Sequence, residues 1–296
     1  MIDEFLTYLR YERNRSERTL LSYSKNLSLF EGFFKGLDAN LSWSTVDSDV
    51  VRLWMEDMMD KGNKASSVCC RLSSVKSFYR YALARGLVKR DPTLDVDGPK
   101  KEKPLPQFVK ESQMDELLDK SSWGEDYKST LKRVILMTFY ETGIRLSELI
   151  GLEDKDVDLT RQELKVTGKR DKQRVIPFGE ELAVALRDYI AVRNREIERR
   201  DAGLFALEKG TRVTGPWVRL MVREELARVC TLRKRSPHVL RHSFATAMIN
   251  HDADLESVRK LLGHVSLSTT EIYTHTTFEQ LKRIYKDAHP RGVITL

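Results

Sequence analysis

Six residues in the second half of the chain have side chains suited to breaking a phosphodiester bond. Two arginines, two histidines and a lysine supply positive charge and hydrogen-bond donors for a phosphate. A tyrosine supplies a phenol that can attack phosphorus once its surroundings activate it. In chain order they are Arg145, Lys169, His238, Arg241, His264 and Tyr273. None is distinctive alone, but their order and the sequence around them predict cutting and rejoining of DNA strands.

The segment from Ser236 to Arg241 has the pattern of a helix start. Serine stands at the N-cap and Pro237 at the first helical position. His238 and Arg241 are three residues apart and share one face of the first turn, where free backbone N–H groups favour an anion. The guanidinium adds bidentate phosphate binding that lysine does not reproduce. A surface or capping role is the alternative for each residue, and His242 is given a structural role.

Arg145 comes two residues after Gly143, which we expect to end a helix as its C-cap. A tight turn at this point would hold the guanidinium in a fixed direction. The alternative is a surface arginine paired with Glu141 or Glu148. Glu148 is also a candidate to orient a neighbouring catalytic side chain.

Lys169 lies at the tip of a predicted hairpin, 168–172. A basic tip can enter a DNA groove, and a lysine there can give a proton to a leaving oxygen; a solvated charged turn is the alternative. Tyr273 follows His264 by nine residues. As a nucleophile it needs positive or hydrogen-bonding neighbours, which the other five residues would supply; a core or surface tyrosine is the alternative.

Composition and charge favour a polyanionic partner. The chain of 296 residues has a formal net charge of +7 and a pI near 9.2, and its length allows two domains. Residues 64–90 contain seven basic residues and no acidic one, whereas residues 47–60 contain five acids and one base. This asymmetry suggests an oriented contact with nucleic acid; a solvated helix surface is the alternative.

Other classes of protein are disfavoured. The three cysteines include the adjacent pair Cys69 and Cys70 and form no disulfide framework, so reduced thiols in a cytoplasm fit best. Without a CxxC pair we expect no structural metal, and without a P-loop no nucleotide, so no cofactor is expected. The N-terminus is not a signal peptide, and no apolar run of about 18 residues exists to place the chain in a membrane.

We expect a mainly α fold with a small β-sheet (α+β). Residues 1–90 read as four helices in a small bundle, with Ser16 and Ser48 as N-caps of the second and third. Residues 91–106, rich in proline and lysine, read as an interdomain linker, or else as a long surface loop. In residues 107–296 we predict strands at 156–159, 163–167 and 173–177 and helices at 112–119, 127–142, 179–200, 215–229, 237–250, 254–262, 268–275 and 277–288. A capping box of Thr276 and Glu279 would open the last helix.

Four segments together resemble the tyrosine recombinases of the phage integrase family, most closely the Xer branch of bacterial chromosome-dimer resolvases. They are TGIRLSEL (142–149), VTGKRDKQRVIPF (166–178), SPHVLRHSFATAMI (236–249) and LLGHVSLSTTEIYTH (261–275). The closing HPRG (289–292) and the helical N-terminal plan match as well. The resemblance therefore covers nearly the whole chain, and four separated motifs in the family's order make it specific.

The resemblance implies a role for each residue of the motifs, without metal or ATP. Arg145 and Arg241 clamp the scissile phosphate and stabilise its transition state. His238 and His264 hydrogen-bond to the same phosphate, and His238 also helps proton transfer. Lys169 protonates the leaving 5′ oxygen. Tyr273 attacks phosphorus and remains attached as a 3′-phosphotyrosine. Glu148 matches an acidic position that supports the site.

The resemblance also implies an architecture and partners. A helical core-binding domain (1–90, SAM-like) and a catalytic domain (107–296) would close on double-stranded DNA carrying a specific recombination site. Two such sites would be joined by a homo-tetramer, or by a hetero-tetramer with a second recombinase. A DNA translocase would be a further partner. The expected location is the cytoplasm of a bacterium, in association with the nucleoid. The last helix, 277–288, would dock on a neighbouring protomer; packing on its own domain is the alternative.

Other readings stay open. An integrase or transposase of a mobile element would use the same chemistry. A relaxase like the type IB topoisomerases would use related chemistry. A DNA-binding regulator without catalysis would use the same basic helices. A metal hydrolase built on His238, His242 and His264 is the most distant, since no HExxH or similar carboxylate set supports it.

Overall fold

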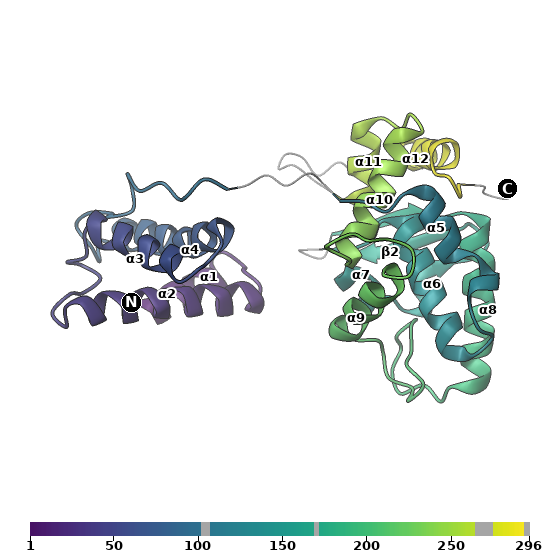
Figure 1. Cartoon of the computed structure of the whole chain (residues 1–296), viewed down its shortest axis with the longest axis horizontal. Helices are drawn as coiled ribbons and strands as arrows, with labels where there is room; N and C mark the ends of the chain where they lie inside the picture. The colour runs from purple at the N-terminus through teal and green to yellow at the C-terminus, as the bar shows by residue number, and fades with distance from the viewer. Residues whose placement is uncertain (102–106, 169–171, 264–274, 293–296) are drawn as a thin grey trace. The chain divides into compact units, whose positions relative to one another are not determined.

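The computed structural model divides the chain into two compact units, Met1–Pro104 and Leu105–Leu296 (Figure 1). It describes residues 1–101, 107–168, 172–263 and 275–292, with only the helical backbone for 275–279. Each unit has its own hydrophobic core. The mainly helical architecture with one small sheet confirms the predicted fold class.

The first unit is a bundle of four helices. They are α1 (Ile2–Tyr11), α2 (Glu17–Leu37), α3 (Ser48–Asp60) and α4 (Ala65–Ala84). The fourth contacts the other three, around an aromatic core that includes Phe30, Trp43 and Phe78. Ser16 caps α2 as predicted, accepting a hydrogen bond from the Thr19 N–H. The predicted cap of α3 is wrong by one residue, because Asp47 provides a carboxylate that accepts from two backbone N–H groups.

The beginning of the segment predicted as a linker packs on this first unit. Val96 is buried in its core, and Thr93 is buried and donates through its N–H and hydroxyl to the Asp91 carboxylate. Cys69 donates to the carbonyl of Pro99. These contacts involve single side chains on an irregular, proline-rich backbone. The sequence there has no helical or strand periodicity from which they could be predicted.

The second unit places helices around a short sheet. The helices are α5 (Glu111–Leu118), α6 (Tyr127–Thr142), α7 (Leu146–Gly151), α8 (Glu180–Glu196), α9 (Gly215–Leu226), α10 (Pro237–Asn250), α11 (Leu255–Leu262) and α12 (His275–Ala288), with 3-10 turns at Lys120–Ser122 and Asp154–Asp156. The sequence did not predict α7. The predicted helix 268–275 lies almost wholly outside the described residues, as do the side chains of the predicted capping box. No helix in the described ranges has the length and apolar character needed to cross a bilayer.

The central element of this unit is α6. Every residue from Val134 to Thr142 is buried, and α8 and α10 pack against it, as expected for a helix that is enclosed on all sides. The helix ends at Gly143, which has a left-handed φ of 58° and donates its N–H to the Phe139 carbonyl at 3.0 Å. This confirms the predicted C-cap. A Cβ at Gly143 would lie 2.5 Å from a ring carbon of Phe244.

The sheet is antiparallel with strand order β1-β2-β3, formed by Val157–Asp158, Glu163–Thr167 and Gln173–Pro177. Leu164 and Val166 of β2 point into the core, between exposed or half-buried neighbours. Val166 pairs with Arg174 of β3. The alternation of a half-buried sheet therefore places an arginine on the buried side. The Gly168 N–H donates to the Lys172 carbonyl at 2.8 Å and begins to close the hairpin.

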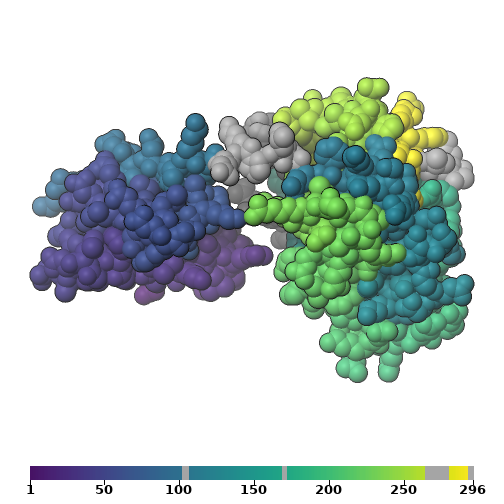
Figure 2. Space-filling view, in the orientation of Figure 1, coloured from purple at the N-terminus to yellow at the C-terminus, as the bar shows by residue number. Residues whose placement is uncertain are grey.

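The C-terminal segment packs on its own unit. Leu281, Tyr285 and Ala288 of α12 are buried in the core, and the helix contacts α10, α11 and β3. In Figure 2 the yellow atoms of α12 lie beside the yellow-green atoms of α10 and α11. Within this single chain, the described part of α12 packs on its own unit. Docking of 277–288 on a neighbouring protomer stays a prediction.

The residues after α12 fasten this packing. His289 is buried between aromatic rings and its Nε2 is 3.3 Å from the Tyr140 carbonyl oxygen. Burial lowers the pKa of His289 to about 3, so the ring is neutral. Arg291 pairs with Asp115 at 3.0 Å and also with Glu181. The motif HPRG therefore ties the end of the chain to α5, α6 and α8.

Replacing Gly143 with alanine should destabilise the second unit. A left-handed alanine costs about 1–2 kcal/mol, and crowding against Phe244 adds roughly 1–3 kcal/mol. Calorimetry should show an unfolding midpoint at least ~4 °C below that of the wild type. Gly151→Ala is the matched control, because Gly151 has open space and no positive φ. Equal midpoints for both variants would contradict the strain at Gly143.

Candidate active site

Arg145 is positioned by the end of α6. Gly143 turns the backbone, Ile144 is fully buried, and Arg145 becomes the N-cap residue of α7. Its side chain is 33% exposed, so the guanidinium is within reach of a ligand while its backbone is anchored in the core. The predicted tight turn that aims this arginine is therefore present.

Glu148 holds Arg145 at two points. Its Oε2 accepts a hydrogen bond from the Arg145 backbone N–H at 2.7 Å, and its Oε1 accepts from Arg145 Nη1 at 2.8 Å. The Glu148 side chain is only 2% exposed. Two carboxylates, Glu141 and Glu148, were considered as partners of Arg145, and Arg145 pairs with Glu148. Glu141 instead faces the backbone N–H of Gly179.

Arg241 reaches the same place from the first turn of α10. Its Nη1 donates to the Gly143 carbonyl at 2.7 Å and its Nη2 to the Leu262 carbonyl at 2.6 Å. Arg145 Nη2 lies 3.3 Å from the carbonyl oxygen of Gly263, the left-handed C-cap of α11. The two arginines thus meet where two glycine-capped helices end, and carbonyls at the negative ends of these helices accept from both.

His238 also lies near the start of α10 but faces solvent. It is the second residue of α10, one turn before the buried Arg241, and makes no hydrogen bond to the described part of the chain. The start of α10 at Pro237 confirms the predicted helix start, although the Ser236 side chain makes no capping hydrogen bond. His242 is exposed as well.

Lys169, His264 and Tyr273 lie outside the described residues. The residues that precede Lys169 and His264, Gly168 and Gly263, are described. Both lie beside the cluster, by which we mean Glu148 and the arginines around it. A Cβ at Gly168 would be 3.3 Å from Glu148 Oε1, and one at Gly263 would be 3.1 Å from Arg174 Nη1. The chain therefore approaches the cluster immediately before Lys169 and again immediately before His264.

Arg174 is a member of the cluster that the sequence analysis missed. Its Nη1 and Nη2 donate to Glu148 Oε1 and Oε2 at 2.8 and 2.9 Å, and its Nε donates to the Leu261 carbonyl at 2.9 Å. The available signal was the alternation of β3, which puts Arg174 and Ile176 on the same, buried side. An arginine at an inward strand position needs a carboxylate partner, and only the folded chain shows which one.

Three guanidinium groups around one carboxylate leave the cluster positively charged. Burial, followed by the charges of Arg145 and Arg174, lowers the pKa of Arg241 to about 10, and Glu148 opposes this shift. Burial alone would raise the pKa of Glu148, but its hydrogen bonds and charge interactions with Arg174 and then Arg145 leave that pKa below its usual value. An anion placed between the arginines would relieve their repulsion.

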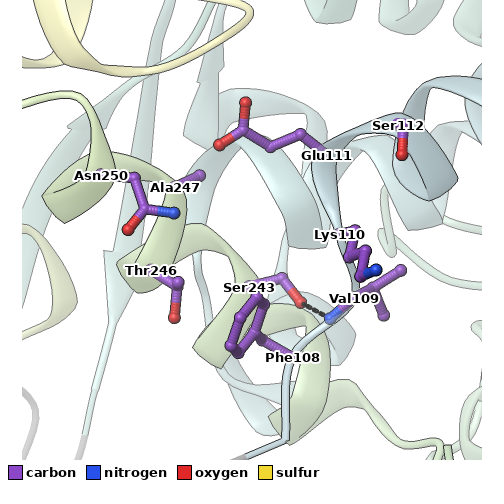
Figure 3. Close-up of a pocket in the computed structure, with 9 residues that line it drawn as sticks. All are labelled: Phe108, Val109, Lys110, Glu111, Ser112, Ser243, Thr246, Ala247 and Asn250. Atoms are coloured by element: carbon purple, nitrogen blue, oxygen red, sulfur yellow. Dashed lines mark hydrogen bonds between the residues drawn. The ribbon is translucent and has the colours of Figure 1, made fainter.

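The cluster is distinct from the groove in Figure 3. That groove, of about 270 Å³, lies between residues 108–112 and α10. Ser243 Oγ accepts a hydrogen bond from the Val109 N–H across it at 2.8 Å. Neither Glu148 nor any of the three arginines lines the groove. The Val109–Ser243 hydrogen bond ties the beginning of the second unit to α10.

Glu148→Gln should lower the free energy of unfolding at pH 7 by about 3 kcal/mol, because it leaves buried guanidinium charge uncompensated. The folded-state pKa of Glu148 is lowered, so its stabilisation is complete above the unfolded pKa of about 4.3 and is lost as pH falls below that value. Urea unfolding between pH 3 and 7 should show the two proteins converging at the acidic end. The exposed Glu224 gives the control, Glu224→Gln; a gap for Glu148→Gln that is independent of pH would contradict the prediction.

Comparison with known proteins agrees with this geometry. The model of the phage integrase family matches residues 107–280, and that of the phage integrase N-terminal SAM-like domain matches residues 2–86. Tyrosine recombinase XerC of Chlorobaculum tepidum is 39% identical over 317 aligned positions, which cover 98% of this chain and 94% of the relative. Tyrosine recombinase XerD of Pseudomonas putida is 37% identical over 297 positions, covering 99% and 98%.

A solved structure has the same fold. The XerH site-specific recombinase, in a post-cleavage complex with its palindromic difH substrate, superposes with a TM-score of 0.72 and 20% identity over 96% of this chain and 83% of that one. Together with the two family models and the relatives, this establishes what the sequence motifs indicated: the chain belongs to the phage integrase family and is a tyrosine recombinase.

Proposed function

We propose that this recombinase cuts and rejoins duplex DNA at a specific site through a 3′-phosphotyrosine intermediate. The observation that carries the proposal is the convergence of Arg145 and Arg241 at a buried, positively charged cluster. A guanidinium has five N–H donors. Each of these two uses two of them on described protein atoms, which leaves three on each for phosphate oxygens.

The cluster suits phosphoryl transfer. The transition state spreads negative charge over the phosphate oxygens, and catalysis consists mostly of in-line positioning and charge stabilisation. Fixed guanidinium groups in a partly buried site stabilise that charge without reorganising. His238, exposed at the N-terminus of α10, stands where helix N–H groups favour an anion and can hydrogen-bond to the same phosphate.

The roles of the other three residues rest on their positions in the family motifs. The phenol of Tyr273 gives up its proton with the help of His238, and its oxygen forms a bond to phosphorus while the bond to the 5′ oxygen breaks. Lys169 gives that 5′ oxygen a proton. His264 hydrogen-bonds to the phosphate. A 5′ hydroxyl of the exchanged strand then attacks the phosphotyrosine and releases Tyr273. The bond energy is retained in the intermediate, so the reaction needs no ATP.

The substrate we propose is double-stranded DNA with a dimer-resolution-type recombination site, by similarity to XerC, XerD and the XerH–difH complex. Two such sites would be joined in a homo- or hetero-tetramer that includes a second recombinase, with a DNA translocase as a further partner, to resolve chromosome dimers. The helical domain, 1–90, and the catalytic domain, 107–296, would both contact the duplex. Sites from mobile elements are the alternative substrate, with unchanged chemistry.

Tyr273→Phe should abolish covalent attachment to DNA. The measurement uses a nicked suicide duplex with a dimer-resolution-type site, incubated in EDTA and analysed under denaturing conditions. The wild type should form a protein–DNA adduct, as should Tyr11→Phe, a control at a tyrosine that is 72% exposed in the first unit. An adduct with Tyr273→Phe would reveal a different nucleophile. Tight wild-type binding without any adduct would favour the DNA-binding regulator or a different site.

Arg80→Gln should weaken DNA binding about equally for all sequences. Arg80 is exposed on α4, and a phosphate contact would contribute about one unit to the slope of log affinity against log salt. Titrations between 50 and 200 mM salt would measure the slope. Arg52→Gln, in which the lost arginine is paired with Asp49 at 2.7 Å in the acidic stretch, is the control. Equal slopes for both variants would exclude a contact at Arg80.

A further inference from the structure

Arg174 is a charged side chain that the catalytic roles above do not use. It is 7% exposed and is held by three hydrogen bonds. Three of its five N–H groups donate to protein atoms, and the side chain is buried at an inward position of β3, so we assign it no direct contact with DNA. Keeping a cation out of water costs several kcal/mol unless its partners compensate, which makes the identity of those partners informative.

The partners of Arg174 all belong to segments that present catalytic groups. The bidentate pair with Glu148 grips the carboxylate that aims Arg145. The bond from Nε fixes the Leu261 carbonyl at the end of α11. The guanidinium also lies against the backbone of Gly263, where a Cβ would approach its Cζ to 3.2 Å. One side chain thus connects three segments far apart in sequence.

The geometry around Glu148 shows what this connection does. A carboxylate has about four lone-pair directions, and Glu148 uses four hydrogen bonds, two to Arg174 and two to Arg145. Arg174 occupies one side as a rigid fork, so the carboxylate cannot rotate and its other lone pairs face Arg145. Lysine at position 174 would keep the charge but lose the fork.

We propose that Arg174 is a positioning residue of the recombinase, which fixes the direction of the Arg145 guanidinium by way of Glu148. The proposal rests on the proposed role of Arg145 in holding the scissile phosphate. Without the fork, Glu148 and Arg145 would still attract each other, but in several orientations. The activation free energy of cleavage would rise, because the guanidinium has to meet the phosphate in one orientation in the transition state. The overall affinity for DNA would change little.

The first test is the rate of single-turnover cleavage of the suicide duplex by Arg174→Lys. Misplacing a catalytic group by about 1 Å can cost on the order of 100-fold in rate, and we expect a decrease of about 10–100-fold with DNA affinity within about threefold of wild type. Arg193→Lys is the matched control. Arg193 is fully buried and bidentate with Asp154 at 2.8 and 2.9 Å, away from the cluster. This control should lose stability but cleave at the wild-type rate when folded.

A double-mutant cycle separates positioning from a general structural role. If Arg174 acts through Arg145, the Arg174→Lys change should cost less than about threefold in an Arg145→Lys background, because the group it aims is gone. Equal factors in both backgrounds would overturn the proposal. An unchanged cleavage rate in Arg174→Lys alone would also overturn it.

A second readout does not depend on cleavage. The side-chain Nε–H resonance of Arg145, assigned by its loss in Arg145→Lys, should be sharp and dispersed in wild type and broadened or shifted towards solvent-exchanging arginines in Arg174→Lys. If wild type forms no adduct, the proposed function or site fails, and this resonance decides about Arg174 by itself. A resonance unaffected by Arg174→Lys would show that Arg145 is held without it.

Discussion

The buried carboxylate of Glu148 is the contact on which the arrangement of the candidate active site depends. Carboxylates are rarely removed from water, because the desolvation cost exceeds what a single partner returns. Here two arginines surround one carboxylate, and four hydrogen bonds satisfy it. The consequence is mutual: the arginines are oriented by a group that cannot move, and the carboxylate stays ionised because they are there.

The backbone contributes as much to this site as the side chains. Arg241 donates to the carbonyls of Gly143 and Leu262, at the ends of α6 and α11. Both helices close with a left-handed glycine, Gly143 or Gly263, which exposes carbonyl oxygens in a fixed direction. Because α6 is buried along its final two turns, the arginines rest on backbone that is enclosed by the core of the second unit. A site that must meet one phosphate geometry benefits from such a foundation.

The surplus of positive charge has a cost in the absence of DNA. Burial and the neighbouring arginines lower the pKa of Arg241 to about 10, which means that the charged form is destabilised in the folded chain. An anion between Arg145 and Arg241 would compensate this destabilisation.

The C-terminal segment shows how a short motif can act far from the chemistry. Neutral His289 and paired Arg291 hold the end of the chain against α5, α6 and α8. Tyr140, whose carbonyl faces His289, precedes the Gly143 turn by less than one helical turn. The packing of the segment after α12 and the positioning of Arg145 thus both depend on the end of α6.

The sequence by itself determined the features that depend on near neighbours in the chain. Gly143 as a C-cap, Pro237 as a helix start and the hairpin of β2 and β3 were predictable, because glycine, proline and alternating apolar residues act over a few positions. The ordered motifs also identified the candidate residues of the site, Arg145 and Arg241 among them. Lys169, His264 and Tyr273 remain predictions from those motifs.

Tertiary structure alone decided the pairings. Arg145 had two plausible carboxylates within four residues, and packing gave Glu148 to it while Glu141 became fully buried beside Gly179. Arg174 found its partners 26 and 87 residues away, and Leu281, Tyr285 and Ala288 of α12 packed into the core of their own unit. Such choices follow from which surfaces meet in the folded core, and a local pattern carries no information about a contact whose partner lies elsewhere in the chain.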